Sequence, residues 1–125
     1  MSAILFVAIG GALGALARYG VSIGAAKLFG DGFPYATLIV NAIGAFTALF
    51  LLTLIAQKTA LTPQLKLFAI VGFLGAFTTF SAFAYETIAL AQNGAWIKAI
   101  ANVLLNNFLA LLCGVFGIFA ARAIV

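Results

Sequence analysis

Four long apolar stretches, separated by short polar connections, make up most of the 125-residue chain. A helix needs about 20 apolar residues to cross the hydrocarbon core of a bilayer. The first stretch is interrupted by Arg18, and the other three contain the uncharged intervals 32–57, 67–85 and 99–121. The pattern therefore predicts an all-α membrane protein, with a single transmembrane domain over residues 1–125 and four helices at about 3–28, 35–57, 65–92 and 97–123.

The connections carry residue types that favour turns and helix starts. Gly30 and Pro34 lie between the first two predicted helices, and Asn93-Gly94 lies between the last two. Each of these types has a backbone preference that suits a turn. Thr62-Pro63 predicts a helix start, with the threonine as N-cap and the proline at the first helical position.

The third predicted helix contains an unusual segment, Gly72–Phe83, in which two glycines, two threonines and a serine interrupt an apolar run. Glycine weakens a helix, and threonine hydroxyls compete for helix carbonyl groups. A continuous helix could accommodate these residues, but they favour a break in the third helix near Gly75–Thr79. Inside a bilayer a break is tolerated only where it is buried in protein or lines a wet cavity. The segment is therefore the first candidate for a functional site.

Small residues recur four positions apart on the predicted helices. The pairs are Gly10 with Gly14, Gly20 with Gly24, and Gly44 with Ala48. Such pairs let helix backbones approach closely, so they predict a tight bundle. A chain with only four helices encloses little of a pathway alone, and self-association is expected.

Composition excludes several classes of protein. Hydrophobic residues make up 66% of the chain and charged residues 6%, which no soluble domain of this size could bury. The net charge of +4 comes from scattered residues, so nucleic acid is not an expected partner. Histidine is absent, Cys113 is the single cysteine, and the sequence has no nucleophile–base pair, phosphate loop or metal-ligand cluster. The chain is therefore not expected to be an enzyme.

The cationic residues do not favour one orientation in the membrane. If the chain crosses the membrane four times, three cationic residues fall on each side: Lys58, Lys66 and Arg122 on one, and Lys27, Lys98 and Arg18 on the other. Orientation normally follows an excess of Lys and Arg in cytoplasmic loops. The balance predicts insertion both ways and assembly as an antiparallel, dual-topology homodimer. The alternative is uniform insertion, in which one lysine outweighs the others.

Few polar side chains lie within the predicted spans. Asn41 follows Thr37 by one turn in the second helix, and Asn102 and Asn106 are one turn apart in the fourth. Asparagine, serine and threonine all offer neutral hydrogen-bond donors. The alternative role for each is structural, as a hydrogen bond between helices.

Phenylalanines interleave with the polar residues of the third helix. Phe77, Phe80 and Phe83 are three apart, so they are predicted to share a broad helical face. The positive edge of a phenyl ring can help to solvate a small anion. The alternative is ordinary contact with the core or with lipid. Two charged residues lie nearby in the spans: Arg18 could snorkel or cap carbonyls at a helix break, and Glu86 could face an aqueous vestibule.

Three segments of the chain resemble the Fluc family of small bacterial fluoride channels. They cover the first three helices in order, and the third is highly specific: Gly10–Ala15 with Arg18-Tyr19, Thr37–Gly44 and Gly72–Phe83. The fourth helix resembles the family in length and character more than in motif. Where other members carry tyrosine and serine, this chain has Asn102 and Asn106.

The resemblance implies an antiparallel homodimer with two fluoride pathways and a broken third helix. It also implies a structural sodium ion at the dimer interface, held by the backbone carbonyls of Gly75 and Thr78. Hard cations prefer such oxygen ligands.

The resemblance further implies a role for each polar and aromatic candidate. Phe80 and Phe83 would turn their ring edges to fluoride, and Asn41 would donate its amide hydrogens. Polar positions along the fluoride pathway would be Ser81, Thr37, Asn106 and Asn102. The implied function is passive export of cytoplasmic fluoride, for detoxification, through the bacterial inner (plasma) membrane.

Two other functions fit the same composition. A small proton-coupled exporter of cationic drugs would need a membrane-embedded acid, and Glu86 is the only candidate. A membrane scaffold subunit would pass no ion at all.

Overall fold

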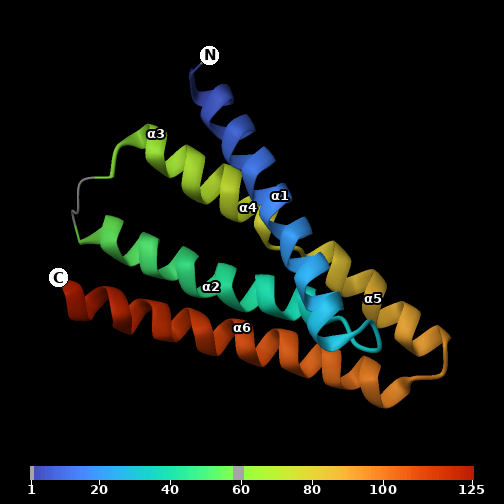
Figure 1. The fold of residues 1–125 in the computed structure, drawn as a ribbon. Coiled ribbons are helices and arrows are strands. Elements are labelled where there is room, and N and C mark those ends of the chain that lie inside the picture. Colours follow the sequence, from blue (N-terminus) through green and yellow to red (C-terminus); the bar gives the residue numbers. More distant parts are fainter. Residues whose placement is uncertain (1, 58–60) are drawn as a thin grey trace.

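The computed structural model describes residues 2–57 and 61–125 of the chain. All regular elements in these ranges are helical (Figure 1). They are α1 (Ser2–Phe29), α2 (Tyr35–Ala56), α3 (Pro63–Lys66), the π-helix η1 (Leu67–Leu74), α4 (Gly75–Phe77), α5 (Phe80–Gln92) and α6 (Trp96–Ile124).

Within residues 2–57 and 61–125, four helical segments are long and apolar enough to cross a membrane. The third of them runs from Pro63 to Gln92 and contains α3, η1, α4 and α5. The ends of the four segments differ from the predicted ends by at most two residues. Thr62 accepts a hydrogen bond from the Leu65 amide at 3.2 Å, and Pro63 opens the helix, as the sequence predicted.

The helices pack in two groups. α2 and α6 lie side by side over most of their length, and α1 packs against η1 and α4 (Figure 1). α5 turns away from α1 and packs against α6. The two halves of the third span therefore belong to different neighbours, and the segment between α4 and α5 lies where the two groups meet.

The chain termini and the connections define two ends of the bundle. The N-terminus, α3 and the C-terminus lie toward one end, and the α1–α2 and α5–α6 connections toward the other (Figure 1). Gly30 and Gly94 in those connections have φ angles of 73° and 79°, a region that glycine adopts without strain. Lys58, which enters the predicted charge balance, lies outside the described residues.

Glycines allow the closest helix contacts. A Cβ atom built at Gly14 of α1 would lie 2.2 Å from the Phe73 carbonyl oxygen of η1, and one at Gly10 equally close to that of Phe68. A Cβ at Gly117 of α6 would lie 2.3 Å from the Phe46 carbonyl oxygen of α2. The predicted close packing at Gly10 and Gly14 is therefore confirmed.

The second small pair of α1 behaves differently. No heavy atom of another described segment lies within 4 Å of a Cβ built at Gly20 or Gly24. Within one copy of the chain, the prediction of close packing is wrong for this pair. The reason is that α1 diverges from the third span beyond α4 (Figure 1).

These contacts predict opposite outcomes for two alanine substitutions in the same helix. Gly14→Ala forces a methyl group against the η1 backbone, which cannot move aside as a side chain can. We expect a loss of about 1–3 kcal/mol in stability, measured as a lower midpoint of thermal unfolding in detergent. Gly20→Ala, the matched control, should keep the wild-type midpoint. An equal loss in both variants would contradict the proposed α1–η1 contact as the cause.

Candidate functional site

Two residues with extended backbone separate α4 from α5. Thr78 has φ −82° and ψ 156°, and Thr79 has φ −153° and ψ 113°. An α-helix pairs each amide with the carbonyl four residues earlier, and extended residues cannot continue that pattern. The polar backbone groups on either side of this segment therefore need other partners.

Asn41 of α2 pairs with the backbone of Thr79. The Thr79 amide donates to Asn41 Oδ1 at 2.8 Å, and Asn41 Nδ2 donates to the Thr79 carbonyl at 3.1 Å. The carboxamide thus satisfies both the donor and the acceptor of one peptide residue. A short side chain on α2 replaces the hydrogen bond that the Thr79 amide would have made in a continuous third helix.

Two further side chains complete the segment. Arg18 of α1, which is half-buried, donates from Nε to the Ala76 carbonyl at 3.0 Å. Of the two roles expected for Arg18, it takes the capping of a carbonyl. The Thr79 hydroxyl accepts from the Ala82 amide at 3.1 Å, which makes Thr79 the N-cap of α5.

A series of side-chain hydrogen bonds runs from Asn41 into α6 and back to α5. Asn41 Nδ2 donates to Asn106 Oδ1 at 3.1 Å, and Asn106 Nδ2 donates to Asn102 Oδ1 at 2.8 Å. Asn102 Nδ2 donates to the Thr87 hydroxyl at 2.9 Å, and that hydroxyl donates to the Phe83 carbonyl at 2.7 Å. Sequence analysis missed Thr87, although a threonine one turn after Phe83 within a span was a signal for it.

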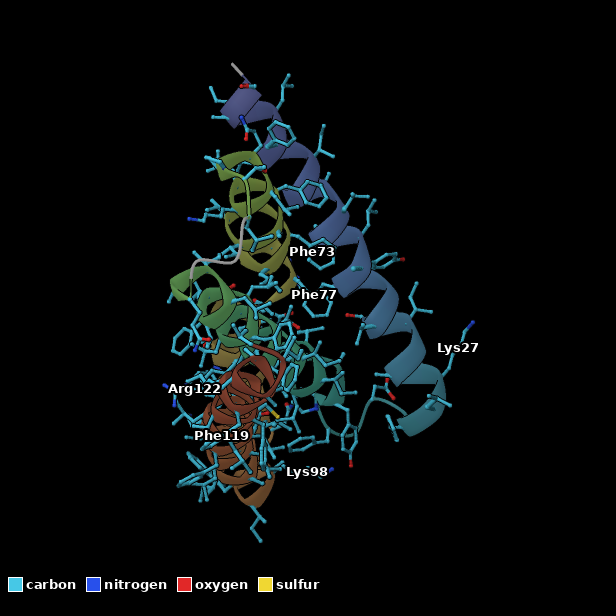
Figure 2. The ribbon with its side chains drawn as sticks, turned by 90° about the vertical axis from the view of Figure 1, so that its left-hand side faces the viewer. Lys27, Phe73, Phe77, Lys98, Phe119 and Arg122 are labelled. Carbon is cyan, nitrogen blue, oxygen red and sulfur yellow. The ribbon has the colours of Figure 1, made fainter. Side chains whose placement is uncertain are left out.

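The phenylalanines of the third span do not share one face. Phe77 is buried and stacks on Phe73 in the region where α1 meets the third span, with ring centroids 5.7 Å apart (Figure 2). Phe80 is 79% exposed and lies edge-to-face with Phe83 at 5.4 Å. The prediction that Phe77 shares a face with Phe80 is wrong, because the extended residues between them break the helical spacing.

An open groove of about 540 Å³ runs beside this segment. Its walls come from α2, α6 and both halves of the third span, and its lining includes Asn41, Gly75, Thr78, Phe80, Phe83 and Asn106. Four of the seven predicted pathway residues thus lie on one surface, together with both predicted sodium ligands. Thr37, Ser81 and Asn102 lie outside this lining.

The three predicted pathway residues outside the groove differ in their surroundings. Asn102 is completely buried, and Ser81 is exposed with its hydroxyl 3.3 Å from that of Thr79. Thr37 is buried and donates its hydroxyl hydrogen to Glu86 Oε1 at 2.8 Å. The other carboxylate oxygen of Glu86 is buried with no hydrogen-bond partner among the described residues.

The backbone beside the groove also provides oxygen atoms of the kind that a hard cation prefers. In a continuous helix the Gly75 carbonyl would accept from the Thr79 amide, and the Thr78 carbonyl from the Ala82 amide. Here those two amides donate instead to Asn41 Oδ1 and to Thr79 Oγ1. Both carbonyls are released from their helical partners, so their chemistry fits a sodium ligand set. Among the described residues, no group of three or more His, Cys, Asp or Glu side chains could hold a metal ion.

Comparison with known proteins relates the whole chain to one family. A family profile described as CrcB-like protein, Camphor Resistance (CrcB), matches residues 5–118. The chain is 41% identical over 122 residues to the fluoride-specific ion channel FluC of Sulfurihydrogenibium sp. (strain YO3AOP1), covering 98% of both chains. It is 50% identical over 106 residues to the FluC of Shewanella sediminis (strain HAW-EB3), covering 85% of both.

A third relative gives the same result. The FluC of Dehalococcoides mccartyi (strain CBDB1) is 48% identical over 112 residues, covering 90% of this chain and 86% of the relative. Because the profile spans residues 5–118 and these relatives align over most of their length, the chain belongs to the CrcB family.

Proposed function

We propose that this multi-pass membrane protein is a passive, fluoride-selective channel that exports fluoride from the bacterial cytoplasm. The observation that carries the proposal is the alignment, over almost the full chain, with relatives named fluoride-specific ion channels. Four apolar spans and a groove lined by neutral polar and aromatic side chains are consistent with it. Such a protein transports an ion without catalysing a reaction. Hydrogen fluoride that enters from acid surroundings dissociates inside, and the channel lets the anion leave.

The chemistry of the groove suits a small, strongly hydrated anion. A pore must replace part of the hydration shell, yet bind weakly enough to release the ion. We assign the donor role in the groove to Asn41 and the ring-edge contacts to Phe80 and Phe83. We assign further donor roles along the pathway to Ser81 and Thr37, which lie outside the groove lining. These groups are neutral, so they solvate fluoride without holding it as a fixed cation would. The nearby guanidinium of Arg18 already donates to the Ala76 carbonyl.

We further propose that two inverted copies form the channel. A side chain as apolar as Phe80 is 79% exposed beside an open groove, which a second copy would cover. The equal number of cations on the two sides supports insertion in both orientations. In this arrangement the extended residues Thr78 and Thr79 act as the functional break of the third helix.

The same proposal includes a structural sodium ion between the two copies. The carbonyls of Gly75 and Thr78 would hold it, since their helical donors bond elsewhere. When bound, the ion would neutralise the partial negative charge of converging carbonyl groups. It would stabilise the interface and would not permeate.

The two alternative functions have less support. The relatives are named channels, so we do not propose a drug exporter that depends on Glu86. A scaffold subunit would have no need of neutral donors along a groove.

The first test measures ion selectivity directly. Liposomes that contain the purified protein should release fluoride rapidly to a fluoride electrode, with hardly any release of chloride under the same gradient. The reason is that small neutral donors can surround fluoride closely, whereas the larger chloride cannot be solvated by the same contacts. Protein-free liposomes serve as the control. Wild-type liposomes that retain their fluoride would overturn the proposed function.

The second test concerns the aromatic ring edges. Phe80→Ile and Phe83→Ile each remove a positive ring edge while keeping an apolar side chain of moderate size, so we expect at least a tenfold slower fluoride release, the loss of about 1.4 kcal/mol. Phe119→Ile on α6 is the matched control, because Phe119 is exposed and lies away from Phe73 and Phe77 (Figure 2). Equal release from all three variants would remove Phe80 and Phe83 from the pathway.

The third test concerns sodium. We expect elemental analysis of the purified protein to find about one sodium ion for every two chains. Transfer to a sodium-free buffer of equal ionic strength should lower the thermal unfolding midpoint, since a ligand that binds only the folded state stabilises it. A midpoint that is the same in both buffers, with no retained sodium, would contradict the proposed site.

A further inference from the structure

The hydrogen bonds from Thr79 to Phe83 form one continuous chain with a single direction. In order, the donors are the Thr79 amide, Asn41, Asn106, Asn102 and the Thr87 hydroxyl, and the last acceptor is the Phe83 carbonyl. The five donor–acceptor distances are 2.8, 3.1, 2.8, 2.9 and 2.7 Å. The chain leaves α5 at its N-terminal cap, crosses α2 and α6, and returns to α5 one turn later. We call these groups the amide chain.

The two ends of the amide chain fix its direction. A backbone amide can only donate, and a backbone carbonyl can only accept. The three asparagines and the threonine between them can each do both, so their orientations are decided from the ends. Thr87 must use its hydrogen on the Phe83 carbonyl and therefore accepts from Asn102. Asn102 must then offer its oxygen to Asn106.

The orientation passes from Asn106 to Asn41 in the same way. Asn106 Nδ2 donates to both the side-chain and the backbone oxygen of Asn102, so its own oxygen faces Asn41. Asn41 can then turn only its NH2 group toward Asn106 and only its oxygen toward the Thr79 amide. Burial strengthens this control, because Asn102 is 0% and Asn106 is 6% exposed, which leaves little access for water to provide other partners.

The orientation matters because Asn41 lines the groove. Its two amide hydrogens point to the Thr79 carbonyl and to Asn106 Oδ1, both of them neutral acceptors. An anion is a stronger acceptor than a neutral oxygen, so it can take one of these hydrogens. The reversed carboxamide would present an oxygen atom, which repels an anion.

We propose that Asn102, Asn106 and Thr87 are positioning residues for anion permeation. By fixing the direction of the amide chain, they keep the NH2 group of Asn41 available to fluoride, and Asn102 and Thr87 do so without touching the ion. This inference rests on the proposed function, and it assigns to Asn102 a part different from the pathway lining that its sequence position suggested.

The test removes the acceptor at the far end of the amide chain. Thr87→Val keeps the shape of the side chain but leaves Asn102 Nδ2 without its partner, so Asn102 is free to reverse. Its NH2 group would then face that of Asn106 in place of the oxygen that Asn106 now donates to, which disturbs the position of Asn106 against Asn41. We expect about a tenfold slower fluoride release per active vesicle and a smaller ratio of fluoride to chloride release. Thr87→Ser restores a hydroxyl and should restore both quantities. Thr47→Val is the matched control, because the half-buried Thr47 lies outside the groove lining and its hydroxyl donates to the Ile43 carbonyl of its own helix at 2.8 Å.

A second variant tests the middle of the amide chain. Asn102→Leu should reproduce the effects of Thr87→Val, whereas Thr47→Val, which lies outside the groove lining, should again behave as wild type.

The vesicle assay separates positioning from a purely structural role. The fraction of vesicles that release fluoride reports how much protein is folded and inserted, and the rate and selectivity report how each channel works. A loss confined to the active fraction, even a complete one, would mean a structural role and overturn the inference. If Thr87→Val and Asn102→Leu both keep the wild-type rate and selectivity, the positioning inference is overturned and the proposed function is unaffected. If the wild-type protein itself gives no fluoride flux, the proposed function is overturned as well.

Discussion

The structure depends on how it satisfies the polar backbone beside Thr78 and Thr79. A bilayer core offers no water, and an unpaired amide or carbonyl there costs several kcal/mol. At this extended segment the amides of Thr79 and Ala82 give up their helical bonds, and side chains replace them. Asn41 supplies partners from α2, Arg18 from α1, and Thr79 from its own hydroxyl.

Close helix packing makes these replacements possible. Asparagine and arginine reach the extended segment only because the neighbouring backbones lie close to it. Glycines at Gly10 and Gly14 allow α1 to approach η1, and Gly44 of α2 leaves room for Thr78, whose Cγ2 atom would lie 2.0 Å from an added Cβ. The same glycines therefore serve packing and, through it, the polar network.

Neutral groups, rather than charged ones, surround the groove. The Arg18 guanidinium donates a hydrogen bond to the Ala76 carbonyl, and the Glu86 carboxylate accepts one from the Thr37 hydroxyl. The donors that remain are amides and hydroxyls arranged by hydrogen bonds to one another. This arrangement suits an ion channel. A donor that bonds to the anion gives up a hydrogen bond within the protein, so the net free energy gained from each contact with the anion is moderate.

The sequence by itself determined that the protein lies in a lipid bilayer, how many times it crosses the bilayer, and which residues are candidates for the functional site. Uncharged apolar stretches of sufficient length allow no other class of fold, and the turn residues and Thr62-Pro63 set the helix ends through local chemistry. The polar segment Gly72–Phe83 stood out because its residue types conflict with a continuous apolar helix. The motifs also pointed to the family, since their residues occur together and in order over three helices.

Only the tertiary structure decided how those residues are used. Sequence spacing placed Phe77 and Phe80 on one face, but two extended residues turn them apart. It suggested pathway positions for Asn102 and Asn106, and packing of α6 against α2 and α5 buries both in the amide chain, with Asn106 but not Asn102 in the groove lining. The direction of a hydrogen bond between two carboxamides depends on partners up to 65 residues away in sequence, as for Asn41 and Asn106. Local patterns cannot specify such partners, because only the assembled bundle brings them together.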